Sequence, residues 1–152
     1  MVLKLFELMN IVLLLLVSGM YWGPWLALTR SIATFEPDAF LAIVQRLNRN
    51  MEPLMTALLP IALLSTLPVL VLEYGSRPAP FYLTLTGSVL FVATLVVTAL
   101  VEVPIVKQIV TWTPSMLPGN WRQLRDRWSA FHYARIVPSV VGLVLILVAA
   151  IF

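Results

Sequence analysis

Four stretches of the chain contain no charged residue, and each is long enough to cross a lipid bilayer. They cover Leu8–Thr29, Pro53–Leu72, Pro78–Val101 and Ile136–Phe152, and their lengths are 22, 20, 24 and 17 residues. A membrane-spanning helix needs about 20 predominantly apolar residues, within a range of about 17–25. The chain is therefore predicted to be an all-α membrane protein with four transmembrane helices.

The composition of the chain agrees with this prediction and excludes several other classes of protein. Of its 152 residues 61% are hydrophobic and only 11% are charged, whereas a soluble domain carries about 25% charged residues. There is no cysteine, and His132 is the only histidine. Disulfide frameworks, thiolate metal sites and sites that need several histidines are therefore excluded for a single chain. The pI of 9.7 indicates contact with a membrane surface rather than with nucleic acid, because the basic residues flank the apolar stretches.

The connections between the stretches predict a single domain over residues 1–152, folded as an up-down-up-down bundle. We expect the four spans over residues 6–29, 53–73, 80–106 and 132–152. Residues 73–80 form a tight turn, so the second and third spans should be antiparallel neighbours. The two longer connections should carry short amphipathic helices over residues 37–49 and 121–131. The first of these should end at the Asn-Arg-Asn run over residues 48–50.

Basic residues are distributed unevenly between the two ends of the predicted bundle. The end with the termini and the tight turn carries Lys4 and Arg77. The other end carries eight basic residues: Arg30, Arg46, Arg49, Lys107, Arg122, Arg125, Arg127 and Arg135. Because basic loops are retained on the cytoplasmic side, we expect both long loops in the cytoplasm and both termini outside.

One face of the predicted helix after the turn at residues 118–120 combines aromatic and charged side chains. Asn120 is a good N-cap, so this helix should begin at Trp121 and continue into the fourth span. Spacings of 4, 3, 4 and 3 place five side chains on one face, here called the stripe: Trp121, Arg125, Trp128, His132 and Arg135. We expect the stripe to face inward.

All five tryptophans map to the predicted cytoplasmic half of the bundle. They are Trp22, Trp25, Trp112, Trp121 and Trp128. An aromatic belt normally decorates both membrane surfaces. The one-sided arrangement therefore favours an aromatic-walled pocket for a planar lipophilic ligand, and contact with lipid headgroups on that side is the alternative.

Glu102 ends the third span, where an acidic side chain is costly without a partner. Its candidate partners at the same end of the bundle are Arg125, Arg135, Lys107 and His132. Further candidate ligand-binding residues in this layer are Asn48, Asn50 and Glu52. A histidine beside a carboxylate can remove a proton from an acidic carbon or a phenol. A structural ion pair with a hydrogen-bonded histidine is the alternative, and Asn10 and Glu73 are expected to be structural.

The same layer raises the question of a metal ion. Glu52, Glu102 and His132 match the composition of a non-haem iron facial triad. However, no pair of them has a diagnostic helical spacing, and the nearby arginines oppose a cation. We expect no metal and no cofactor, with a mononuclear metal at these three residues as the lesser alternative.

The chain resembles the anthrone-oxygenase-like family of small four-span membrane proteins, most of which are bacterial. The resemblance rests on Val103-Pro104-Ile105, Trp112, Leu117-Pro118, Trp121, Arg125, Trp128, His132 and Arg135, with a second element at residues 48–53. Some fungal members oxidise polyketide anthrones to anthraquinones, so the resemblance implies oxidation of such a compound without a metal or a flavin. Family members often carry a Pro-x-Asn pattern in the third span, and Val106 stands here in place of that Asn.

Two functions follow from the resemblance and the residues together. In the first, the protein oxygenates a planar lipophilic substrate without a cofactor, with His132 as base, Glu102 beside it, and Arg125 and Arg135 stabilising an oxyanion. In the second, it is a non-catalytic subunit or a lipid- or quinone-binding module packed against a larger membrane complex. Membrane lipids, a lipophilic small molecule and either further copies or a larger complex are the expected partners, and a bacterial inner membrane is the expected location.

The topology can be tested directly with reporter fusions. We expect a reporter after Phe152 to be active only outside the cytoplasm and a reporter beside Arg46 only inside it, because of the eight-to-two distribution of basic residues. A reporter after Phe152 that is active in the cytoplasm would contradict this topology and place both long loops outside.

Overall fold

The computed structural model describes all residues from Met1 to Phe152, and it contains helices and no strand. Four helical segments are long and apolar enough to cross a membrane. The first is α1 (Val2–Ala27) and the last is α6 (Trp121–Ile151). The second consists of α2 (Pro37–Leu64) and α3 (Thr66–Glu73). The third consists of α4 (Pro78–Val97), the π-helical turn η2 (Thr98–Glu102) and α5 (Val103–Ile109).

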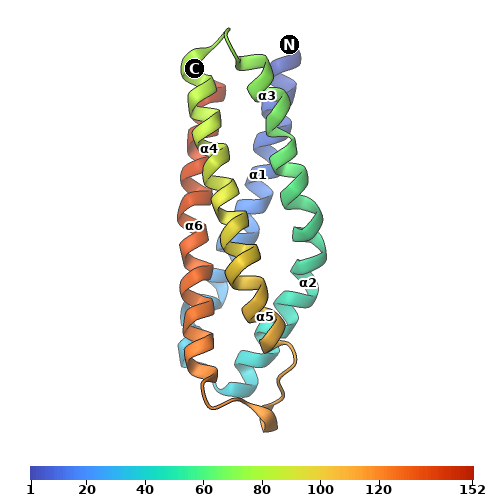
Figure 1. Cartoon of the computed structure of the whole chain (residues 1–152), viewed down its shortest axis with the longest axis vertical. Helices are drawn as coiled ribbons and strands as arrows, with labels where there is room; N and C mark the ends of the chain where they lie inside the picture. Colours follow the sequence, from blue (N-terminus) through green and yellow to red (C-terminus); the bar gives the residue numbers. More distant parts are fainter.

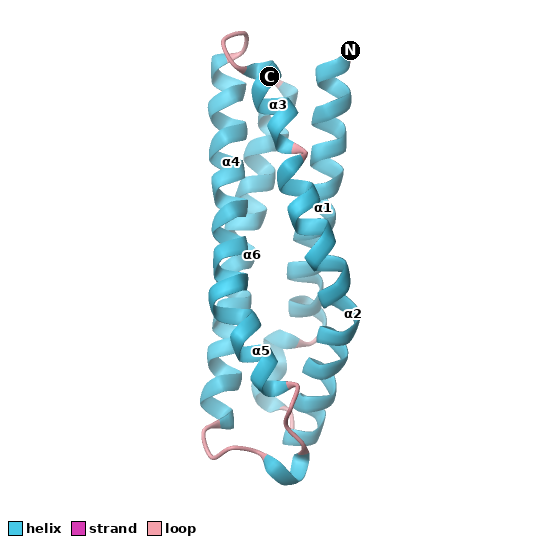
Figure 2. Cartoon of the chain, turned by 45° about the vertical axis from the view of Figure 1, so that its right-hand side comes forward, coloured by secondary structure: helices cyan, strands magenta, loops and turns pink.

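The four segments lie side by side and form an elongated bundle. Both termini and the turn between α3 and α4 lie at one end, here called the terminal end (Figure 1). The other two connections lie at the opposite end, here called the loop end, and each contains a short 3₁₀ helix: η1 (Thr29–Thr34) and η3 (Pro114–Met116). The view in Figure 2, turned about the long axis, shows the same arrangement.

The helix predicted to begin at Trp121 and continue into the fourth span is confirmed, whereas the segment over residues 37–49 is not a separate loop helix. Residues 37–49 are the first part of α2, which continues through Asn50 and Pro53, and residues 121–131 are the first part of α6. The amide of Asn48 donates to the carboxylate of Glu52 one turn later, at 2.8 Å, instead of capping a new helix. The residues on both sides of residues 48–50 are helical, so α2 continues through this segment without a break. The interruption falls instead at Ser65, three residues before Pro68, which has no N–H to continue the helix.

Two glycines bring α4 and α6 into close contact near the middle of the bundle. A Cβ atom placed on Gly87 would lie 2.7 Å from the carbonyl oxygen of Gly142, and one on Gly142 would lie 2.8 Å from that of Gly87. The buried ring of Phe91 packs beside this contact. Small residues allow this approach, which adds van der Waals contact between helices that have no hydrophobic driving force in lipid.

A cluster of charged side chains closes the bundle at the terminal end. Glu7 and Glu73 are buried, and Arg77 contacts both, at 2.7 Å and 3.7 Å. Lys4 lies 2.9 Å from Glu7 and donates to the carbonyl oxygen of Ala150 on α6. The cluster thus ties α1, α3 and α6 together, and it marks one edge of the apolar part of the bundle.

Asn10 connects α1 to the interruption between α2 and α3. Its amide donates to Ser65 Oγ at 2.8 Å and to Thr66 Oγ1 at 2.9 Å, and its side chain is fully buried. These bonds satisfy polar groups that the helix break leaves inside the bundle. The structural role expected for Asn10 agrees with this placement.

Two apolar clusters fill the bundle at different heights. The middle cluster includes Leu14, Leu59 and Phe91. The loop-end cluster includes Phe40, Ile109 and Trp121, and it packs the 3₁₀ helix η1 and the start of α6 against α2 and α5. The polar layer predicted from the sequence lies between these two clusters.

The contact between α4 and α6 predicts opposite effects for two Gly→Ala substitutions. We expect Gly142→Ala to lower stability by about 1–3 kcal/mol, because its Cβ would overlap the Gly87 carbonyl. Gly19→Ala is the matched control: its Cβ would meet nothing within 4 Å, so the gain in helix propensity should raise stability by up to about 1 kcal/mol. Thermal unfolding in detergent measures both changes, and equal effects would show that the glycine contact does not hold these helices together.

Candidate functional site

A cavity of about 440 Å³ lies between the two apolar clusters. Its wall is formed by α1, α2, the segment from α4 through η2 to α5, and α6. More than half of the lining residues are hydrophobic, which is typical of small-molecule sites that fix a ligand with a few polar groups. Three flexible methionines, Met20, Met51 and Met55, form part of this apolar surface.

Glu102, Arg135 and His132 form a connected polar group on one side of the cavity. The Arg135 guanidinium forms an ion pair with the Glu102 carboxylate and donates to Thr98 Oγ1 at 3.2 Å. It also donates to His132 Nδ1 at 2.8 Å, and its charged end lies 4.5 Å from the centre of the Tyr21 ring. The sequence-based prediction of a partner for Glu102 among the nearby basic residues and His132 is confirmed.

The π-helical turn η2 places two of these side chains. The N–H of Val103 donates to the carbonyl of Thr98, five residues back. Pro104 follows at once and has no N–H for the carbonyl of Leu100, so the α-helical bonding pattern cannot pass through this point unchanged. The wide turn presents Thr98 and Glu102 on the same side, both toward Arg135. Such turns often occur at functional sites.

The contact with Arg135 assigns the proton on the His132 ring. A guanidinium group can only donate, so Nδ1 must accept, and the proton of the neutral ring is on Nε2. This Nε2–H has no partner in the protein and is buried. In this arrangement His132 offers a hydrogen-bond donor, whereas the base expected from the sequence needs a free lone pair on the ring.

Several buried polar atoms beside the cavity have no hydrogen-bond partner in the protein. They are Tyr21 Oη, Glu102 Oε1, His132 Nε2 and Arg135 Nε. Buried polar atoms are almost always satisfied, since each unpaired group costs about 1–3 kcal/mol. These four, of ten such atoms in the bundle, leave donors and acceptors free beside the cavity.

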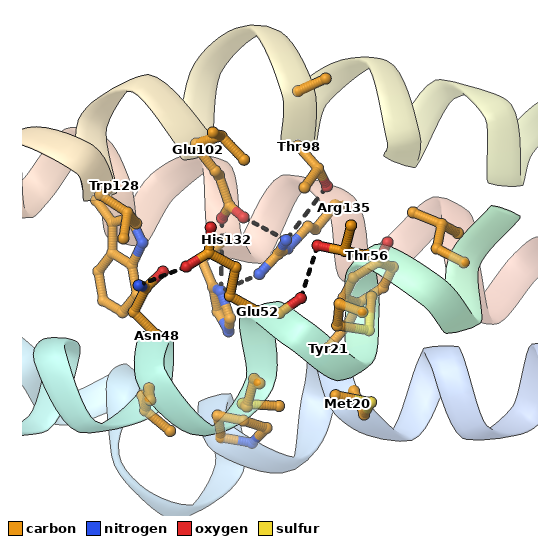
Figure 3. A pocket seen from close by; sticks show the side chains of 18 of the residues that line it. Met20, Tyr21, Asn48, Glu52, Thr56, Thr98, Glu102, Trp128, His132 and Arg135 are labelled. Carbon is orange, nitrogen blue, oxygen red and sulfur yellow. Dashed lines mark hydrogen bonds and ion pairs between the residues drawn. The ribbon is translucent and has the colours of Figure 1, made fainter.

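A second polar pair approaches the cavity from α2. The Asn48 amide donates to Glu52 Oε2 at 2.8 Å. Figure 3 shows this pair and the Glu102–Arg135 pair projecting from different helices toward the same space. The charged lining residues are therefore Glu52, Glu102, Lys107 and Arg135, and their charges sum to zero when His132 is neutral.

The stripe on α6 is buried as predicted. Trp121, Arg125, Trp128 and His132 are each at most 8% exposed, whereas Arg122, Gln123, Asp126 and Arg127 on the other side of the helix are exposed. The stripe is longer than the cavity, however. Only Trp128, His132 and Arg135 line the cavity.

Arg125 and Trp121 lie closer to the start of α6 and belong to the loop-end cluster. Arg125 donates to the carbonyl of Ala33 at 3.3 Å, pairs with Asp126 at 2.8 Å and stacks on Trp121. It is about 10 Å along the helix axis from His132, because each residue adds about 1.5 Å. The structure therefore does not bring Arg125 to the polar group where it was expected to stabilise an oxyanion.

The other predicted tryptophans and Asn50 also lie outside the cavity. Trp22 is 44% exposed on the outer face of α1, and Trp25 packs against Tyr133. Trp112 packs against the loop-end cluster, and its carbonyl accepts from Gln45. Asn50 is exposed on α2. The cavity wall thus contains one tryptophan, Trp128, whose ring lies 5.3 Å from that of His132, and the expected tryptophan-walled pocket is lined largely by aliphatic and methionine side chains.

Two of the proposed metal ligands lie side by side, with His132 Nδ1 3.5 Å from Glu102 Oε1, and Arg135 contacts both of them. No group of three or more His, Cys, Asp or Glu side chains is placed to share a metal ion. The Arg135 guanidinium pairs with Glu102 and donates to His132 Nδ1, so its positive charge opposes a cation at these atoms. The donor set Glu52, Glu102 and His132 therefore does not fit a mononuclear metal in this arrangement.

Sequence reasoning missed Tyr21, Thr98 and the methionines of the cavity wall. Thr98 precedes Glu102 by four residues, a spacing that places both on one helical face. Tyr21 and Met20 are part of an apolar span, and no sequence signal separates them from residues that face lipid. Val106 also lines the cavity and adds to its apolar wall.

Glu102→Gln is expected to destabilise the bundle by about 3–5 kcal/mol, because the Arg135 charge would remain buried without its partner. The double substitution Glu102→Gln with Arg135→Gln should recover part of this loss, which a double-mutant cycle of unfolding free energies measures. Asp126→Asn is the control, since Asp126 is 61% exposed and its pair with Arg125 should contribute only about 0–1 kcal/mol. If the effects of the single substitutions Glu102→Gln and Arg135→Gln simply add in the double variant, a direct interaction between the two side chains is contradicted.

Comparison with known protein families gives a match that covers the polar group and the helices around it. The family model described as "Anthrone oxygenase" matches residues 41–145, a range that contains Glu52, Glu102, His132 and Arg135. Comparison with curated proteins and with solved structures found no match. The family match covers more than half of the chain and includes the cavity-lining parts of α2, η2, α5 and α6. The chain therefore belongs to the anthrone oxygenase family.

Proposed function

We propose that the protein binds a neutral, planar, lipophilic molecule in the cavity and oxidises it with molecular oxygen. The observation that supports this most directly is the set of unpartnered polar atoms of Tyr21, Glu102 and His132 around an otherwise apolar cavity. An aromatic ketone or phenol is complementary to this cavity, because it is a flat apolar ring system that carries one or two oxygen atoms. Family membership supports an anthrone-like compound as the first candidate.

The two polar walls can act on different parts of such a ligand. His132 Nε2–H donates to the ligand oxygen, and the neighbouring Arg135 stabilises negative charge that develops there. Glu52 projects from the opposite wall, with Oε2 held by Asn48, and accepts a proton from the acidic carbon. Trp128, stacked on His132, provides a flat surface for the ring system.

The reaction balances with oxygen as the only oxidant. Loss of a proton from the CH₂ group of an anthrone gives an enolate, whose negative charge is spread to the ketone oxygen. Dioxygen adds to the ring carbon, and the proton returns to give a hydroperoxide. The hydroperoxide loses water and forms the second carbonyl, so one anthrone and one O₂ yield one anthraquinone and one H₂O. No step needs an electron from a cofactor, and we propose that none is used.

The proposed setting is a bacterial inner membrane with both termini outside and the cavity near the cytoplasmic surface. The uneven distribution of basic residues supports this orientation. Membrane lipids surround the bundle, and its exposed apolar side chains leave room for contacts with further copies or with a larger membrane complex. In a non-catalytic module, the same cavity would bind the ligand without consuming oxygen.

Oxygen uptake by the purified protein with anthrone separates the enzyme from the binding module. We expect anthraquinone to form in proportion to the oxygen consumed, and Glu52→Gln to lower turnover about 100-fold or more while anthrone still binds. Asn48→Ala should lower turnover about 10- to 100-fold, because Glu52 loses the bond that orients it.

Asn50→Ala is the matched control, since Asn50 lies two residues away on the exposed side of α2. It should retain the wild-type rate. Wild-type protein that binds anthrone but consumes no oxygen would exclude the oxygenase and leave a binding module. Equal rates for wild type and Glu52→Gln would exclude Glu52 as the proton acceptor.

A further inference from the structure

The cavity is closed toward both ends of the bundle. The middle cluster, which includes Leu14, Tyr21 and Leu59, lies between it and the terminal end. The loop-end cluster, which includes Phe40, Ile109 and Trp121, lies between it and the loops. A molecule entering along the bundle axis would have to pass through one of these packed layers to reach His132.

The exposed part of the cavity wall lies on one side of the bundle. The lining residues of α1 and α6 are buried or half-buried. The exposed lining residues form two rows with a spacing of four: Glu52, Thr56 and Pro60 on α2, and Ala99, Val103 and Lys107 on η2 and α5. Because each row follows one helical face, the two rows border a single opening between α2 and the third span.

Both rows change from charged to apolar residues in the same direction along the bundle. α2 and the third span run in opposite directions (Figure 1), so Glu52 and Lys107 lie toward the loop end, while Pro60 and Ala99 lie toward the middle of the bundle. The opening therefore has a charged edge and an apolar edge. This order corresponds to the change from headgroup layer to hydrocarbon in a bilayer.

The distance of the opening from the terminal end also places it at the boundary between the headgroup layer and the hydrocarbon. Glu73 belongs to the charged cluster that marks the far edge of the apolar region. Pro60 is about 20 Å and Glu52 about 31 Å from Glu73 along the helix axis, at a rise of about 1.5 Å per residue. Since the hydrocarbon layer is about 30 Å thick, Pro60 lies inside it and Glu52 lies at its edge.

Both spans that border the opening contain local breaks in regular helix at this level. Pro53 and Pro60 interrupt the hydrogen bonding of α2, and the π-helical turn η2 followed by Pro104 does the same in the third span. In contrast, α4 and α6 approach closely at Gly87 and Gly142. The bundle is thus tightly joined on one side and open on the side where the cavity meets lipid.

We propose that the ligand is a neutral molecule dissolved in the membrane and that it reaches the cavity sideways from the bilayer, through the opening between Thr56–Pro60 and Ala99–Val103. This inference rests on the proposed function, because it assumes that the cavity binds such a ligand. The polar end of the molecule follows the edge formed by Glu52 and Lys107, and its apolar rings pass between Pro60 and Ala99.

The test measures anthrone binding to the protein in lipid nanodiscs, without oxygen so that no turnover occurs. Anthrone is delivered from donor vesicles, and quenching of protein fluorescence gives the association and dissociation rate constants. Ala99→Phe narrows the opening, so both rate constants should fall about tenfold while Kd changes by less than about threefold, as expected for a change in access alone. Val103→Phe is the second variant at the same opening.

Val92→Phe is the matched control, because Val92 is exposed two helical turns earlier on the same face but does not line the cavity. It should bind and release anthrone at wild-type rates. Wild-type rates for both Ala99→Phe and Val103→Phe would overturn lateral access and leave the proposed function intact. Loss of affinity with an unchanged association rate would also overturn it, because residue 99 would then act in binding. Wild-type protein that fails to bind anthrone would overturn the proposed function and this inference with it.

Discussion

The ion pair between Glu102 and Arg135 is the interaction on which the candidate site depends. It joins the third span to α6 where an isolated charge of either sign would be costly. Arg135 has several donors in a fixed plane, so one side chain holds Glu102, Thr98 and the His132 ring at once. The orientation of every other polar group on this wall follows from that arrangement, including the free Nε2–H of His132.

The fold protects this charged group and still leaves it accessible. Apolar clusters above and below exclude water, which strengthens electrostatic interactions inside the cavity. The close α4–α6 contact at Gly87 and Gly142 holds one side of the bundle together. The prolines and the π-helical turn prevent the same close packing between α2 and the third span. A closely packed side and an open side therefore coexist in one small bundle.

The balance of charge in the cavity limits what the family chemistry can act on here. Two acidic and two basic side chains line the wall, so an ionic ligand would leave one charge uncompensated in an apolar environment. A neutral ketone or phenol can use the unpartnered donors and acceptors without that cost. In the proposed reaction, negative charge would appear only after proton transfer, next to a guanidinium that is already in place, and such an arrangement stabilises a transition state more than the substrate.

The sequence by itself determined the fold class, the four spans, the inward stripe on α6 and the pairing of Glu102 with a nearby cation. Charge-free length, helical periodicity and the cost of a buried charge are local or pairwise properties, and they can be read along the chain. Only the tertiary structure decided that Arg125 and most of the tryptophans lie outside the cavity, that Tyr21 and Thr98 contact Arg135, and that residues 37–49 belong to α2. The height and rotation of each helix relative to its neighbours set these outcomes. In apolar spans those two quantities depend on side-chain packing and on the π-helical turn, which the spacing of residues along one helix does not encode.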